Sequence, residues 1–160
     1  MVAASAESWA VFFHLLGAFV LVSGVVVAGV AFEAARRRRR PGEVALLLRL
    51  TRVGVLLVVA GALVVLVFGL WLVDLDDAGF GTTWVEASLG LFVAMLVVGA
   101  IGGQRPKRAR MLATQLDEQN AAETPELRAM LDDRTALVLN YLSAALLLAI
   151  VVLMVFQPGD

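Results

Sequence analysis

The chain has 160 residues and a net charge of −1 at pH 7; apolar residues make up 61% of it and charged residues only 17%. This composition excludes an ordinary soluble domain and predicts segments that cross a membrane. The chain has no cysteine, which excludes disulfide bonds, thiolate metal ligands and thiol catalysis.

Four runs have the length and apolar character of membrane-spanning helices. A hydrocarbon layer about 30 Å thick needs roughly 20 helical residues, each rising about 1.5 Å. The runs are residues 8–32, 53–73, 83–103 and 135–157. Because unpaired backbone groups are costly in lipid, an open sheet is not an alternative. The sequence therefore predicts an all-α protein, a single membrane domain over residues 1–160 in which four transmembrane helices form a bundle.

The charged residues predict the direction of the chain. All the basic residues fall on one side of the four spans: the five arginines of residues 36–40, then Arg49, Arg52, Arg105, Lys107, Arg108, Arg110, Arg128 and Arg134. The other side carries only acids: Glu7, Asp74, Asp76, Asp77 and Asp160. By the positive-inside rule we expect both termini on the non-cytoplasmic side of a bacterial cytoplasmic (inner) membrane and loop 104–134 in the cytoplasm. Trp9, Trp71 and Trp84 agree, since all three lie at the outer ends of spans.

The basic segments invite two interpretations. A run of five arginines can indicate nucleic-acid binding, but next to a span end it favours a topology signal that also touches anionic lipid. We therefore expect the lipid bilayer, and no nucleic acid, as partner. Within the loop, "RARMLATQLDEQN" has apolar residues at helical spacing and predicts a helix on the membrane surface. Thr124 followed by Pro125 predicts the start of a second helix.

Small and polar residues indicate which face of each span is directed inward, because lipid itself is as apolar as leucine. On the first span the stripe that contains His14, the only histidine, also contains Ala10, Gly17, Ala18, Leu21, Gly24 and Ala28. The corresponding stripes are Gly54, Gly61, Ala62 and Gly69 on the second span; Glu86, Gly90 and Ala94 on the third; and Asn140, Ser143, Ala144, Leu147, Val151 and Met154 on the fourth. We expect His14, Glu86 and Met154 to meet in one layer near the outer surface.

Three interpretations of that layer remain open. His14 and Glu86 can hydrogen-bond and hold two helices together, a contact worth about 1 kcal/mol in membranes. Imidazole and thioether are also the usual axial pair of a low-spin haem, so His14 and Met154 can bind a haem or porphyrin; without the ring they make a poor metal site. Thirdly, a buried carboxylate and imidazole can handle protons or ions. No nucleophile, base and orienting group are arranged for catalysis, so the sequence predicts no catalytic residues and favours a protein that is not an enzyme.

Three segments resemble one bacterial family of predicted four-helix integral membrane proteins of unknown function: "FFHLLGAFVLVSG", "GLWLVDLDDAGFGTTWVEASLGL" and "NYLSAALLLAIVVLMVFQPGD". The first span is also similar in pattern to CopD-like copper-resistance proteins and HemJ-like protoporphyrinogen oxidases, which place a histidine early in a span and a glycine further on, as His14 and Gly24 do here. The HemJ-like histidine is associated with haem, so this resemblance implies haem binding through His14. Those enzymes also rely on a lysine in a later span, and CopD-like proteins carry more candidate ligands; this chain has neither.

The leading hypothesis is a membrane protein associated with haem or a porphyrin, with His14, Met154 and Glu86 as cofactor-binding candidates and no separate metal site. The alternative is a non-catalytic subunit or assembly partner of a larger membrane complex, or a homo-oligomer, in which His14 and Glu86 are interhelical contacts. The many small residues motivate this alternative because they let helices dock closely.

Overall fold

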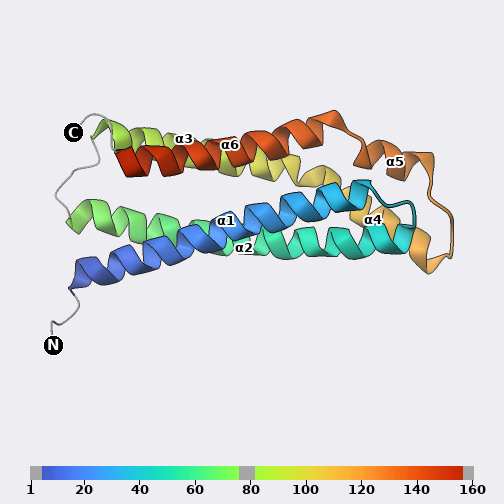
Figure 1. The fold of residues 1–160 in the computed structure, drawn as a ribbon, viewed down its shortest axis with the longest axis horizontal. Helices are drawn as coiled ribbons and strands as arrows, with labels where there is room; N and C mark the ends of the chain where they lie inside the picture. Colours follow the sequence, from blue (N-terminus) through green and yellow to red (C-terminus); the bar gives the residue numbers. More distant parts are fainter. Residues whose placement is uncertain (1–4, 76–81, 157–160) are drawn as a thin grey trace.

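The computed structural model describes residues 5–75 and 82–156, which form six helices. They are α1 (Ala6–Arg36), α2 (Pro41–Leu75), α3 (Thr83–Gly102), α4 (Gln104–Glu118), α5 (Pro125–Leu131) and α6 (Arg134–Phe156), shown in Figure 1. Four helical segments are long and apolar enough to cross a membrane, and they contain α1, α2, α3 and α6. The prediction of an all-α protein with four such helices is confirmed. Asp76, Asp77 and Asp160, used above to predict direction, lie outside the described residues.

The helices form two antiparallel pairs, α1 with α2 and α3 with α6 (Figure 1). At one end of the molecule α1 and α3 begin and α2 and α6 end; we call this the cavity end, for the cavity described below. At the opposite end, the basic end, α4 and α5 pack against the pairs. With 35 residues, α2 is roughly 50 Å long, which exceeds the hydrocarbon thickness of a bilayer. Its first turns therefore extend beyond the apolar layer.

Backbone contact joins α1 to α2. A Cβ atom added to Gly24 would lie 2.7 Å from the carbonyl oxygen of Gly54, and one added to Gly54 would lie 2.8 Å from that of Gly24. Gly17 and Gly61 form a second contact of the same kind, with 2.8 Å between a Cβ on Gly61 and the Gly17 oxygen. The glycines on each helix are seven residues apart, the spacing of a left-handed supercoil. The predicted inward faces of the first two spans are thus confirmed.

The contact between the two pairs is made by larger side chains. These are Leu21 from α1, Ala62 and Val65 from α2, Phe92 and Met95 from α3, and Leu147 and Ile150 from α6. On α3 the buried residues are Val85, Ser88, Phe92 and Met95, so the predicted inward face with Glu86, Gly90 and Ala94 is wrong. A Cβ on Gly90 would meet nothing within 4 Å. Because α3 faces a wide gap, bulky residues rather than small ones fill it.

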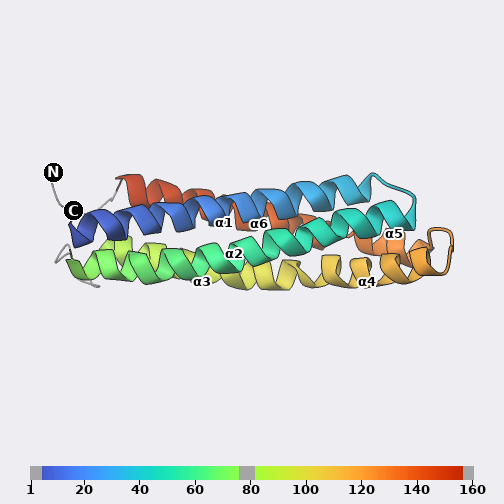
Figure 2. The same ribbon diagram turned by 90° about the horizontal axis from the view of Figure 1, so that it is seen from below.

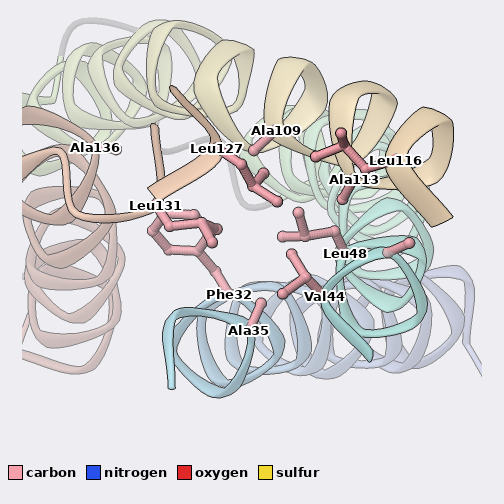
Figure 3. Packing of buried hydrophobic residues seen from close by; sticks show 11 residues of the cluster. Phe32, Ala35, Val44, Leu48, Ala109, Ala113, Leu116, Leu127, Leu131 and Ala136 are labelled. Carbon is pink, nitrogen blue, oxygen red and sulfur yellow. The ribbon is translucent and has the colours of Figure 1, made fainter. Parts of the chain in front are cut away.

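A second apolar core closes the basic end (Figure 3). Leu127 and Leu131 of α5 are fully buried there, among side chains from α1, α2 and α4. Figure 2 shows α4 running on in the direction of α3 and alongside α2. The helix predicted within residues 108–120 therefore exists, and it buries Leu116 inside the protein while Met111 is exposed. Its predicted position on the membrane surface stays a prediction. The predicted start of α5 is confirmed: the Thr124 hydroxyl accepts a hydrogen bond from the Leu127 N–H at 3.3 Å.

Two arginines bind each other's helix ends at this core. Arg36, in α1, donates from Nε to the carbonyl oxygen of Leu131, the last residue of α5, at 2.7 Å. Arg128, in α5, donates from Nη1 to the Arg36 oxygen and from Nη2 to the Arg38 oxygen, both at 2.7 Å. Carbonyls at helix C-termini lack intrahelical partners and carry partial negative charge, so a guanidinium satisfies them well. The first arginine of the basic run is thus part of the tertiary structure.

The glycine contacts predict a position-dependent effect of adding one methyl group. Gly24→Ala should lower the free energy of unfolding by about 1–3 kcal/mol, because the new Cβ meets backbone atoms that cannot move independently. Gly90→Ala is the matched control, since its Cβ enters open space. Denaturant unfolding of the purified variants in detergent measures both; equal stabilities would contradict direct backbone contact.

The hydrogen bonds from Arg128 to the end of α1 predict that Arg128→Gln destabilises α5. Loss of two charge-assisted hydrogen bonds and of the ion pair with Glu123 should cost about 1–3 kcal/mol and raise the amide exchange of α5 and of the end of α1. Arg40→Gln removes the same charge from an exposed residue of the same end and should leave exchange unchanged. Hydrogen exchange read by mass spectrometry makes the comparison, and similar protection in both variants would show that the capping contributes nothing.

Candidate functional site

An apolar cavity of about 500 Å³ lies between the two helix pairs at the cavity end. All four long helices line it, and no charged residue is among the lining residues that the structure describes. Its floor is formed by side chains that join the pairs, including Leu21, Phe92 and Ile150. A space of this size, with few polar groups, is typical of binding sites for small apolar molecules.

The cavity opens between α1 and α6. Val11 and Leu15 of α1, and Val151 and Val155 of α6, line it and are 40–69% exposed. Lining residues on the opposite side, such as Leu72 of α2, are less exposed. Because the mouth consists of apolar side chains on membrane-length helices, it faces lipid hydrocarbon.

His14 enters the cavity from α1 and is held by α2. Its Nδ1 lies 3.1 Å from the carbonyl oxygen of Val65. A carbonyl can only accept, so Nδ1 must carry the proton and donate it. In the neutral ring this leaves the lone pair on Nε2. Gly69 makes room for the imidazole, since a Cβ there would lie 3.0 Å from Cε1 of His14. In metal sites, a hydrogen bond from the nitrogen that does not bind the metal fixes the tautomer of a histidine ligand in this way.

Stacked aromatic rings support this part of α1. Phe13, next to His14, stacks on Phe68 of α2 with ring centroids 4.8 Å apart. Trp9 stacks on Phe13 at 6.0 Å, and Phe68 lies 5.9 Å from Trp71. These rings join α1 to α2 beyond the glycine contacts, so the His14 backbone is fixed on both sides along the helix.

The structure brings together two of the three predicted site residues. Met154 of α6 lines the same cavity as His14 of α1, so the thioether and the imidazole come from different helix pairs. Glu86 does not line the cavity, and it is exposed. Its predicted contact with His14 is wrong, because α3 is rotated so that Val85 and Ser88 are directed inward instead.

Ser88 is the site residue that sequence reasoning missed. It is 3% exposed, lines the cavity, and its Oγ has no hydrogen-bond partner within the described part of the chain. A buried polar group without a partner costs about 1–3 kcal/mol, which makes it a natural contact for a bound molecule. The sequence signal that could have identified Ser88 is its spacing: it lies four and seven residues before Phe92 and Met95, and so on the same face of the helix.

The arrangement can bind a flat apolar molecule that also presents an atom for a nitrogen ligand. The lining residues with donor atoms include His14, Met154 and Ser88, and of the two His14 nitrogens Nδ1 is already bonded to Val65. Neutral imidazole and thioether are soft to borderline ligands that suit iron in a porphyrin. Because the lining carries no basic side chain, acidic substituents on a ring would have to remain outside it in water.

Comparisons with known proteins point to one family. Residues 9–158 match the family described as predicted integral membrane protein (DUF2269). No curated protein and no solved structure matches the chain, so the similarity to CopD-like and HemJ-like proteins stays a prediction. The family match covers α2, α3, α6 and all of α1 except its first three residues, and it includes His14, Ser88 and Met154. The chain therefore belongs to this family of predicted integral membrane proteins, whose function is unknown.

Proposed function

We propose that the chain binds a haem or related porphyrin in the cavity between the helix pairs, with His14 as an axial ligand. One observation carries the proposal: the Nδ1 of His14 is committed to the Val65 carbonyl while the ring lines an uncharged cavity of about 500 Å³. The remaining nitrogen, Nε2, is then both deprotonated and pre-oriented. A histidine that served only to join helices would need no such space beside it.

Met154 is the proposed second ligand. It lines the same cavity as His14 and lies on α6, which belongs to the other helix pair, so the two side chains can approach a ring from different pairs. When bound, haem supplies one-electron redox chemistry, and a thioether ligand raises its potential relative to a second histidine. The protein's own contribution is to exclude water, to fix the imidazole tautomer and to offer Ser88 as a hydrogen-bond partner.

The distribution of basic residues supports one orientation of the chain in the membrane. They lie toward the basic end, opposite the cavity, which supports a cytoplasmic location for that end and a non-cytoplasmic location for the cavity. We propose the cytoplasmic membrane of a bacterium as the location, with the mouth of the cavity within the outer leaflet. Acidic substituents of the ring would then reach the water outside the cell.

The proposal predicts a Soret band from the detergent-purified protein after haem is supplied. His14→Ala should abolish the band, because the nitrogen ligand is lost. Met154→Leu should keep the band but convert a low-spin spectrum to a high-spin one, because a weaker ligand or none replaces the thioether. Oxidised and reduced absorption spectra distinguish the three proteins.

Glu86→Gln is the matched control in this series. It alters an ionisable residue near the same end that does not line the cavity, so its spectrum should equal that of the parent protein. A band that survives in His14→Ala, or no band in any protein, would refute haem binding through His14.

A different observation favours the second candidate, a non-catalytic subunit or homo-oligomer. Glu86 and Gly90 lie one turn apart on the exposed face of α3, and a Cβ on Gly90 would meet nothing within 4 Å. A carboxylate and a small residue on a face otherwise turned to lipid are typical of a surface where another helix docks. We propose this face as the contact if the chain is part of a complex.

This candidate predicts a complex that depends on Gly90. Gently extracted protein should show a discrete heavier species by native mass spectrometry, and Gly90→Leu should dissociate it because the added side chain keeps a docking helix away. Ala144→Leu enlarges an exposed residue of α6 instead and should leave the species intact. A lone chain in all three samples would exclude the subunit role.

A further inference from the structure

A second cavity, of about 200 Å³, lies where α3 passes into α4 and α6 begins. One wall is apolar and is formed by Ile101, Ala136 and Leu139. The other wall is polar and includes Arg105, Arg108 and Asp133. It is remote from the apolar cavity, since it lies toward the basic end and shares no lining residue with it.

The cavity is lined by two arginines and one aspartate, so one positive charge is not neutralised. Arg105 Nε lies 3.2 Å from Asp133 Oδ2, and the other oxygen of Asp133 accepts a hydrogen bond from the Thr135 N–H at 2.9 Å. The carboxylate therefore neutralises one guanidinium charge, and its Oδ2 is buried and accepts no hydrogen bond within the described part of the chain. Arg108 forms no ion pair within residues 5–75 and 82–156. Arg105, Arg108 and Asp133 line the cavity and together carry a net charge of +1, and the cavity is large enough for a phosphate group.

The position of the cavity favours a phospholipid over a free phosphate ion as the source of that phosphate. α3 ends at Gly102 and α6 begins at Arg134, so both apolar segments end beside the cavity. A phospholipid at this boundary presents a phosphate to the arginines and the first carbons of its chains to the apolar wall. A free phosphate ion would leave that wall without a partner.

We propose that this cavity binds the headgroup of an anionic phospholipid from the leaflet at the basic end. Arg108 and the terminal nitrogens of Arg105 bind the phosphate, while Ile101 and Leu139 contact the beginning of the acyl chains. The phosphate of an anionic headgroup is not neutralised by a cation such as choline, so its net negative charge complements the uncompensated Arg108. This site is distinct from the general attraction of exposed basic residues to a membrane, because it needs particular side chains.

The experiment uses the full chain in nanodiscs of phosphatidylcholine that contain a minor share of phosphatidylglycerol. Native mass spectrometry counts the phosphatidylglycerol molecules retained on the released protein. Arg108→Gln should reduce retention about tenfold, because it removes charge-assisted hydrogen bonds to the phosphate as well as the charge. Lys107→Gln is the matched control: it removes the same charge from the neighbouring exposed residue, which does not line the cavity, and should change retention much less.

Two further samples complete the test. Arg108→Lys should restore much of the retention, because it returns the charge without the planar fork of donors. Excess inorganic phosphate should not displace the lipid. Equal losses in Arg108→Gln and Lys107→Gln, no preference for phosphatidylglycerol over phosphatidylcholine, or displacement by inorganic phosphate would each overturn the proposal. The last result would assign the cavity to a soluble anion.

Discussion

Direct contact between the backbones of α1 and α2 is the constraint on which the rest of the structure depends. At the crossings of Gly24 with Gly54 and of Gly17 with Gly61, no side chain separates the two helices. This contact fixes their register, and the register brings the imidazole of His14 to the carbonyl of Val65. A different register would place a branched side chain where Gly69 now leaves room. The candidate ligand is therefore positioned by residues that never touch the cavity.

The two ends of the molecule are held together by different forces. At the basic end, apolar residues of α4 and α5 leave water when they pack on α2, so the hydrophobic effect operates as in a soluble protein. At the cavity end the long helices are surrounded by hydrocarbon, and burying leucine against leucine there gains little. The pairs are thus drawn together at one end and can remain apart at the other. The apolar cavity follows from this difference.

The sequence predicts the fold well and the site only in part. Spans, helix class and the inward faces of α1 and α2 follow from length, hydropathy and small residues, because backbone contact requires glycine. The same reasoning fails for α3, which borders a cavity: there Phe92 and Met95 face inward and Gly90 faces out. His14 and Met154 are found from their chemistry. Ser88 and the Val65 carbonyl are not, because the rotation of α3 and the register of two helices decide which groups reach the cavity.

The mouth between α1 and α6 determines which concentration of a bound molecule controls the occupancy of the cavity. Its rim is apolar, with Leu15 on one side and Val155 on the other, so a molecule that enters there arrives from the bilayer. The relevant concentration is then a mole fraction in lipid rather than a molarity in water. Partitioning into the membrane becomes the first step of association, and it favours hydrophobic molecules before any contact with His14 is made. Adding detergent would lower that mole fraction, whereas adding buffer would not.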